Sequence, residues 1–229
     1  MANDKQQNQP TEQPSDQQKK SGRIKMLLIL AVCIAPVAAS YFTYYVIKPT
    51  ARTNYGELID PAQHPMPQLG ATTLDGKPIG LDAYKGKWIL LEAAGGKCDD
   101  ACRNKLLVMR QERLMQGKEM DRIERVWLIT DDEPLDTMLM REYDDTRMLR
   151  VKPEVLEKWL PVAQGGAVSD GIYVIDPLGN LMMRFPKSVE PPKAGADEKE
   201  MKAYRDEVNK EHAKIKKDIT KLLTASSIG

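Results

Sequence analysis

Two cysteines four residues apart carry the chemistry that this chain could perform. Cys98 and Cys102 lie in the sequence Gly-Gly-Lys-Cys-Asp-Asp-Ala-Cys, which follows an apolar run and opens a predicted helix. A spacing of i and i+4 places both sulfurs on one helical face, within reach of each other. Two soft sulfurs at this spacing suit Cu(I), and they could equally form a disulfide in an oxidising compartment.

Charged neighbours act on the cysteines in opposite directions. The helix N-terminus, together with Lys97 and Arg103, favours a thiolate on Cys98. Asp99 and Asp100 oppose that charge, although both residues also suit the first turn of a helix. The sequence therefore does not fix the direction in which the pKa of Cys98 is shifted.

Two other interpretations of the cysteines compete with redox or copper chemistry. A structural zinc site normally takes four ligands, and His64 and His212, the chain's two histidines, would have to supply the others. Alternatively, the cysteines continue through Leu106 as an apolar helical stripe, on which a free cysteine packs as a small core residue. The residues alone leave the redox, metal and packing roles open.

Strands that alternate with helices are predicted to position the cysteines. Residues 87–93 form an almost continuous apolar run that is typical of a strand buried on both faces. The other predicted elements are, in chain order, a hairpin at 73–79, a helix at 99–116, a strand at 125–130, helices at 136–143 and 153–160, a hairpin at 171–185 and an amphipathic C-terminal helix. This order predicts a layered α/β domain with buried parallel strands.

An apolar segment precedes the domain and predicts a membrane anchor. Residues 26–47 contain no charged residue, and 22 positions at about 1.5 Å each match a hydrocarbon layer of roughly 30 Å. Basic residues are more frequent before the segment than after it: Lys19, Lys20, Arg23 and Lys25 against Lys48 and Arg52. This asymmetry keeps the N-terminus in the cytoplasm. A cleaved signal peptide is the rival interpretation, but the apolar stretch continues past the small residues at 37–39.

These features divide the chain into four predicted parts. They are a disordered cytoplasmic tail at 1–25, a transmembrane helix at 26–47, a linker at 48–67 and an exported domain at 68–229. The predicted location is a bacterial-type inner membrane, crossed once, with the C-terminal domain in the periplasm. A net charge of +1 and the lack of a basic stripe interleaved with aromatic residues argue against a nucleic-acid partner.

In this order the elements and the cysteine motif resemble the Sco/SenC family, the membrane-anchored, thioredoxin-like proteins of cytochrome c oxidase assembly. The likeness covers about residues 68–224 and rests on four motifs: Gly86-Lys87-Trp88-Ile89-Leu90-Leu91, Cys98-Asp99-Asp100-Ala101-Cys102, Asp132-Glu133-Pro134-Leu135-Asp136-Thr137 and Tyr173-Val174-Ile175-Asp176-Pro177-Leu178-Gly179. The chain departs from the family at two places. Arg103 stands where the family usually carries proline, and residues 167–172 contain no histidine where the family has its third copper ligand.

The resemblance implies a thioredoxin-like fold, copper held by Cys98 and Cys102, and a cytochrome c oxidase subunit as partner. Three functions are compatible with the residues. The first is an assembly factor for a copper-containing respiratory oxidase, which acts by Cu(I) handling or by thiol reduction. The second is a thiol–disulfide oxidoreductase in which Cys98 attacks and Cys102 resolves the mixed disulfide. The third is a non-catalytic interaction module, so the residues do not decide whether the protein is an enzyme.

Overall fold

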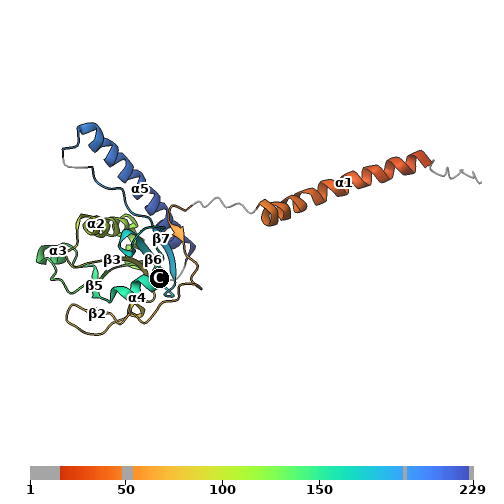
Figure 1. Cartoon of the computed structure of the whole chain (residues 1–229). Helices are drawn as coiled ribbons and strands as arrows, with labels where there is room; N and C mark the ends of the chain where they lie inside the picture. Colours follow the sequence, from red (N-terminus) through yellow and green to blue (C-terminus); the bar gives the residue numbers. More distant parts are fainter. Residues whose placement is uncertain (1–15, 48–53, 193–194, 227–229) are drawn as a thin grey trace, which may run out of the picture. The chain divides into compact units, whose positions relative to one another are not determined.

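The computed structural model describes residues 16–47, 54–192 and 195–226 (Figure 1). The chain divides into two compact units, Met1–Arg52 and Thr53–Gly229. They are called the N-terminal unit and the C-terminal domain below, and each is described by itself.

The N-terminal unit is helical. It contains α1, Asp16–Phe42, and the π-helical turn η1, Thr43–Ile47. The part Arg23–Val46 has a mean hydropathy of 2.2 and is long and apolar enough to cross a membrane. Residues 16–25 were predicted to be disordered, and this prediction is wrong, because Gln and Lys readily extend a helix that a neighbouring segment has already nucleated. The rest of the predicted tail, residues 1–15, lies outside the described residues.

A mixed sheet forms the centre of the C-terminal domain. Among the described residues it has seven strands, in the order β1-β7-β6-β3-β4-β5-β2. The strands are β1 Glu57–Leu58, β2 Thr72–Thr73, β3 Trp88–Ala94, β4 Ile123–Ile129, β5 Arg147–Arg150, β6 Ile172–Ile175 and β7 Leu181–Phe185. β3, β4 and β5 run parallel, and the other neighbouring strands pair antiparallel. Every residue of β3 and β4 is buried, as predicted for parallel strands covered on both faces.

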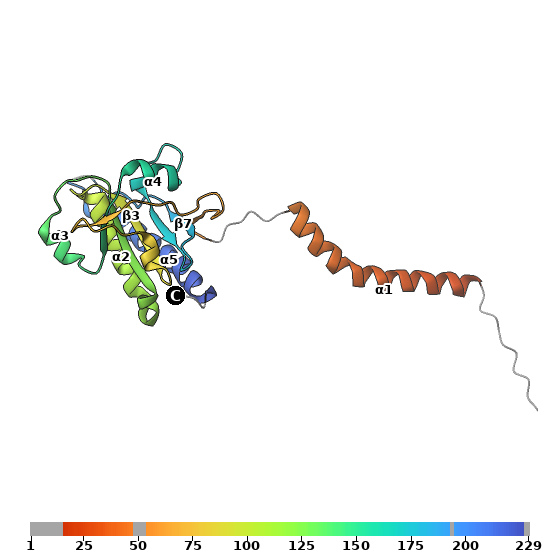
Figure 2. The same cartoon turned by 90° about the horizontal axis from the view of Figure 1, so that it is seen from below.

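Helices cover both faces of the sheet. Figures 1 and 2 show α2 and α5 on one side of the sheet and α4 on the other. The helices are α2 Asp100–Met115, α3 Thr137–Glu142, α4 Pro153–Trp159 and α5 Glu198–Ala225, with short turns η2 Leu81–Tyr84, η3 Gly117–Arg122 and η4 Val168–Asp170. Two apolar clusters result, one on each face, and both cysteines belong to the cluster under α2 and α5. The layered α/β architecture predicted from the sequence is therefore confirmed.

The predicted linker is partly a component of the domain. The C-terminal domain begins at Thr53, and β1 pairs with β7 through Glu57 and Leu58. Residues 54–67 therefore fold with the sheet, whereas the remainder of the predicted linker, 48–53, lies outside the described residues. Prolines at positions 61, 65 and 67 gave this segment the composition of a linker, but a strand of two residues can pair on a sheet edge without an apolar periodicity of its own.

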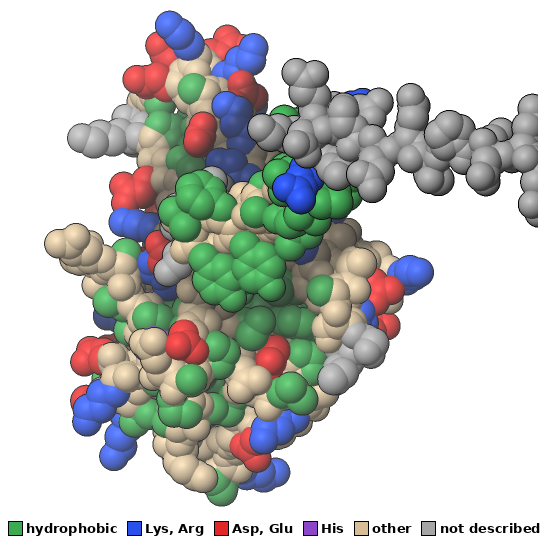
Figure 3. Space-filling view, turned by 90° about the vertical axis from the view of Figure 1, so that its right-hand side faces the viewer, with side chains coloured by type: hydrophobic (Ala, Val, Ile, Leu, Met, Phe, Trp, Pro, Cys, Tyr) green, Lys and Arg blue, Asp and Glu red, His purple; other side chains and the backbone are tan. Residues whose placement is uncertain are grey.

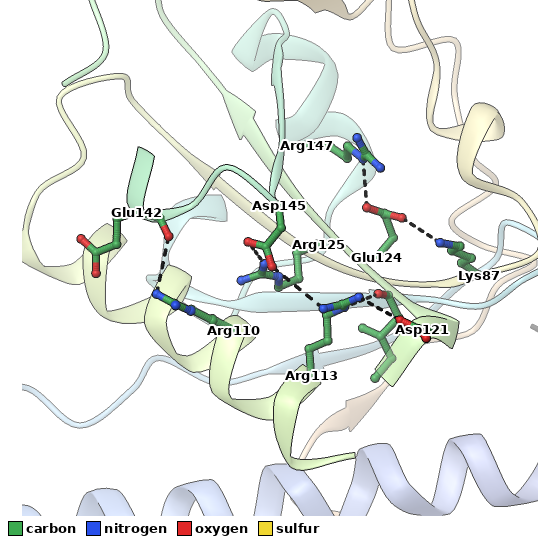
Figure 4. Close-up of polar contacts among 10 residues, drawn as sticks. Lys87, Arg110, Arg113, Asp121, Glu124, Arg125, Glu142, Asp145 and Arg147 are labelled. Atoms are coloured by element: carbon green, nitrogen blue, oxygen red, sulfur yellow. Dashed lines mark hydrogen bonds and ion pairs between the residues drawn. The ribbon is translucent and has the colours of Figure 1, made fainter. Parts of the chain in front are cut away.

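Charged side chains of β4 lie inside the domain and form ion pairs with residues in or beside the neighbouring strands (Figure 4). Arg125 is 1% exposed and forms an ion pair with Asp145. The adjacent Glu124 accepts hydrogen bonds from Lys87 at 3.3 Å and from Arg147 at 2.9 Å. Because Lys87 directly precedes β3 and Arg147 begins β5, the Glu124 carboxylate connects three neighbouring strands.

Candidate functional site

The two cysteines are bonded to each other. Cys98 and Cys102 form a disulfide with an S–S distance of 1.98 Å and a Cα–Cα distance of 5.1 Å. Cys98 lies in the loop after β3, and Cys102 lies in the first turn of α2, for which Asp99 is the N-cap. The prediction that both sulfurs lie within reach of each other is confirmed.

Two glycines let the loop before Cys98 approach the segment after β4. The Gly96 N–H donates a hydrogen bond of 2.8 Å to Oδ1 of Asp131. A Cβ atom on Gly95 would lie 2.4 Å from Oδ2 of Asp131, and one on Gly96 would lie 2.7 Å from the backbone oxygen of Glu133. The Glu133 backbone oxygen cannot easily give way to a Cβ, so glycine is required at position 96, and the hydrogen bond from Gly96 to Asp131 positions the loop that carries Cys98.

Cys98 has an unusual backbone conformation. Its φ angle is +43°. Among the residues that the structure describes, no other residue except glycine has a positive φ. A non-glycine residue in this region costs of order 1–3 kcal/mol, and the conformation persists only where the surrounding structure holds it. The Cys98 N–H donates to the Gly95 carbonyl at 3.1 Å, and Nε of Arg103 donates to the Cys98 carbonyl at 3.2 Å. Arg103 also pairs with Asp136 at 3.4 Å, so Arg103 holds this turn in place.

The start of α2 is occupied by a carboxylate. Oδ1 of Asp99 accepts a hydrogen bond of 2.9 Å from the Cys102 N–H. Asp99 therefore uses the positive end of the helix dipole that the sequence analysis assigned to a Cys98 thiolate. Lys97, another group expected to favour that thiolate, lies 4.0 Å from the carboxylate of Glu133.

Packed side chains cover the disulfide. Cys98 is 4% exposed and Cys102 is 1% exposed. Leu106 and Met109, which continue the same helical stripe, are fully buried beside them. The stripe thus packs as core while its first two residues form a disulfide. A partner can reach either sulfur only after the surrounding structure opens locally.

A buried acid lies in the same layer as the disulfide. Glu92 in β3 is 0% exposed and points to the side of Leu90 and Ala94, which is the side covered by α2. Nζ of Lys105, one turn after Cys102, lies 3.3 Å from Oε1 of Glu92. Neither Glu92 oxygen has a hydrogen bond within the described part of the chain, since this ion pair lacks the geometry of one. Burial raises the pKa of Glu92 to about 8, although Lys105 lowers it.

Glu92 is not among the site residues predicted from the sequence, because it lies in the run at residues 87–93 that is otherwise almost entirely apolar. The sequence does carry a signal for Glu92: it is the single carboxyl in a strand predicted to be buried on both faces. An acid in such a position must have a charged partner or an altered pKa.

The histidines do not join the cysteines. Nδ1 of His64 is hydrogen-bonded to the Trp159 carbonyl at 3.0 Å, and Nδ1 of His212 to the Glu112 carboxylate at 3.0 Å. The hydrogen bond to Glu112 raises the pKa of His212. Within residues 16–47, 54–192 and 195–226, no group of three or more His, Cys, Asp or Glu side chains could hold a metal ion. The zinc alternative therefore lacks its four ligands.

Two hollows lie beside the disulfide. One, of about 460 Å³, is lined in part by Asp100, Ala101, Lys105, Ser169 and Asp170. The other, of about 480 Å³, is lined in part by Ala94, Gly95, Thr130, Ala167 and Ser169. The segment in which the Sco/SenC family carries its histidine thus borders both hollows. Its one carboxylate, Asp170, accepts a hydrogen bond of 2.7 Å from the Ala167 N–H.

The comparisons agree with this architecture. Residues 88–201 match the family model described as the transmembrane-like, thioredoxin-like, C-terminal domain. The domain is thioredoxin-like. A comparison with curated proteins finds no match.

Solved structures similar to the thioredoxin-like domain include Sco/SenC proteins and an oxidoreductase domain. Bradyrhizobium japonicum ScoI with copper bound is 19% identical over 59% of this chain and 92% of its own, with a TM-score of 0.36. A SCO1/SenC family lipoprotein from Bacillus anthracis strain Ames is 17% identical over 69% of this chain and 98% of its own, with a TM-score of 0.43. The thioredoxin domain of a thiol-disulfide oxidoreductase from Bacteroides vulgatus is 18% identical over 62% of this chain and 93% of its own, with a TM-score of 0.39. Values this low carry no argument about activity.

Proposed function

We propose that this protein is a membrane-anchored thiol–disulfide protein whose Cys98–Cys102 pair exchanges electrons with two cysteines of a partner. The observation that carries the proposal is the disulfide itself, formed within four residues at the junction of β3 and α2. A thioredoxin-like fold alone would not support it, because one fold serves many functions.

The exchange is balanced without a further reactant. A partner thiolate attacks one sulfur of the pair, so that a mixed disulfide forms and the Cys98–Cys102 bond breaks. The partner's second thiolate then attacks the mixed disulfide and releases the sulfur of the pair. The pair ends as two thiols, and the partner ends with a disulfide. The reverse sequence reduces a partner disulfide.

The chain's own residues control access and protonation in this exchange. The positive φ of Cys98 is imposed by its surroundings, so local opening of the loop releases strain of order 1–3 kcal/mol. The Glu92 carboxyl lies in the same layer and has a pKa of about 8, which is close to the operating range of a proton donor or acceptor at neutral pH.

Trapping of the mixed disulfide tests the proposal. The full-length protein, in a Cys33→Ala background, keeps only the two cysteines of the pair as thiols. Cys102→Ser should accumulate a mixed disulfide with a peptide that carries a disulfide: the Cys98 thiolate attacks one peptide sulfur, the other leaves as a thiolate, and the variant has no second thiol to complete the exchange. Cys98→Ser is the matched control and should accumulate less if Cys98 is the residue that attacks. If neither variant forms an adduct unless the protein is denatured, the exchange function is wrong.

Assembly of a copper-containing respiratory oxidase is the specific role that the motif resemblance adds to this proposal. An oxidase subunit would then be the partner, in the periplasm of a bacterial-type inner membrane. The reduced pair would supply two thiolates, which suit Cu(I). The family's third ligand has no counterpart in residues 167–172, so the donor set does not match the family's copper site.

Two measurements separate copper handling from the other roles. Cu(I) titration of the reduced protein should show tighter binding than the Cys98→Ser/Cys102→Ser double variant; equal binding by both would refute copper handling. In a deletion strain, the same double variant should fail to restore oxidase assembly. Full restoration by it would instead establish a non-catalytic interaction module, a role with which the burial of both cysteines is also compatible.

A further inference from the structure

The second half of α5 carries a stripe of lysines. Lys210, Lys214, Lys217 and Lys221 follow one another at steps of four, three and four, so they share one face of the helix. The first three are exposed, and the side chain of Lys221 is 40% exposed. These four residues are called the lysine stripe below.

Exposed acids are absent from α5 between residues 208 and 226, although Lys210 pairs back to the exposed Glu207 at 3.8 Å. Between residues 208 and 226, all of which the structure describes, the acids are Glu211 and Asp218, which are 6% and 2% exposed. The first half of α5 differs, because acids and bases alternate there. Figure 3 shows red and blue side chains mixed over the end of α5 that projects from the domain. Charge is therefore segregated along the helix.

Asp218, one of these two buried acids, holds residues 55 and 56 beside the lysine stripe. Asp218 accepts hydrogen bonds from the N–H groups of Tyr55 and Gly56, at 2.6 and 3.0 Å. Lys214 lies 5.1 Å from the centre of the Tyr55 ring, and Nζ of Lys221 lies 3.3 Å from the side-chain oxygen of Asn54. The lysine stripe therefore borders the point at which the chain enters the domain.

The chain between this point and the membrane segment is short. Six residues, 48–53, separate Ile47 at the end of η1 from Asn54. Even a fully extended chain of this length spans no more than about 25 Å. If α1 crosses a membrane, the lysine stripe is thus covalently confined to the neighbourhood of that membrane's surface.

The helix dipole does not account for the stripe. Basic residues near a helix C-terminus are favoured, but only within about the last turn. The last turn of α5 contains no basic residue, and the stripe begins four turns before the end of the helix. A shallow hollow of about 610 Å³, lined in part by Lys217, Thr220 and Lys221, lies along the stripe.

We propose that the lysine stripe binds the anionic phospholipid headgroups of the membrane that α1 anchors. The complementary charges and the short connection to the anchor both favour this occupant over a free protein partner. The inference rests on α1 being a membrane anchor and is independent of the chemistry at Cys98 and Cys102.

Energy transfer from the domain to the lipid tests this inference. The full chain is placed in nanodiscs that contain a trace of dansyl-labelled lipid, either in neutral phosphatidylcholine alone or with phosphatidylglycerol added. The three tryptophans, at positions 88, 127 and 159, all lie in the C-terminal domain and serve as donors. Transfer should be several-fold higher in the anionic discs and should fall in about 1 M NaCl, where the Debye length is about 3 Å. Equal transfer in both lipid compositions would overturn the inference.

A pair of variants with the same charge change separates the stripe from net charge. Lys210→Gln/Lys214→Gln/Lys217→Gln should abolish the difference between the two lipid compositions. Lys199→Gln/Lys202→Gln/Arg205→Gln, in the first half of α5, should retain it. If the two triple variants showed the same difference in energy transfer between the two lipid compositions, the lysine stripe would not be the binding surface. If the first variant fails to fold, the lipid and salt comparisons of the unchanged protein still decide. Activity of the cysteine pair, measured by adduct trapping, is a separate readout.

Discussion

At the scale of single residues, Glu92 links the candidate site to pH. Its carboxyl is fully buried, and burial raises its pKa from 4.5 to about 8. The folded protein therefore holds a proton on Glu92 that the unfolded chain releases at a lower pH. The stability that this group contributes is present below about pH 4.5 and is lost as the pH rises toward 8.

We expect Glu92→Gln to remove that pH dependence. The amide cannot ionise, so the free energy of unfolding of the variant minus that of the unchanged protein should increase steadily between about pH 4.5 and 8. Chemical denaturation at several pH values measures this difference. A difference that stays constant over the range would show that the Glu92 carboxyl is ionised in the folded protein.

Part of the site could be predicted from residue types and part could not. The spacing of Cys98 and Cys102 was sufficient to predict that their sulfurs meet. The contacts of Asp131 with Gly96 and of Arg103 with the Cys98 carbonyl join segments that lie apart in the chain or depend on a positive φ. No local pattern encodes such contacts, since they exist only once β3, β4 and α2 are packed.

At the scale of elements, β4 depends on a buried ion pair. The guanidinium of Arg125 is 1% exposed and lies against the half-exposed carboxylate of Asp145, just before β5 (Figure 4). Burial lowers the pKa of Arg125, and Asp145 opposes that change. Loss of the carboxylate would leave a buried positive charge without its principal partner, which is costly in a protein interior.

Asp145→Ala should therefore destabilise the domain by about 3 kcal/mol. Asp144→Ala is the matched control, because it removes the neighbouring exposed carboxylate and should change stability by no more than about 0.5 kcal/mol. Thermal unfolding of the two variants gives the comparison. Equal melting temperatures would mean that Arg125 is stabilised by groups other than Asp145.

The sequence predicts long elements better than short ones. β3, β4, α2 and α5 are long enough for their apolar periodicity to identify them. β5 has four residues, two of them arginines, and β1 has two residues, so neither carries a pattern of its own. Their strands form because neighbouring edges offer unpaired backbone groups, which is a property of the assembled sheet.

At the scale of the whole molecule, an apolar helix and a thioredoxin-like domain form separate compact units. Composition predicts the helix, because a run of this length without charges is long and apolar enough to cross a membrane. We expect the full chain to stay with the membrane after alkaline carbonate extraction. A chain that begins at Asn54 should be soluble and should melt cooperatively. Release of the full chain by carbonate would show that α1 does not anchor the protein.

The central claim is that Cys98 and Cys102 cycle between disulfide and dithiol in the folded protein. Redox titration of the full-length Cys33→Ala protein, followed by alkylation and mass measurement, tests it most directly. We expect one two-electron transition, between about −270 and −120 mV, with the protein folded throughout. Thiols that appear only when the protein unfolds would contradict the claim.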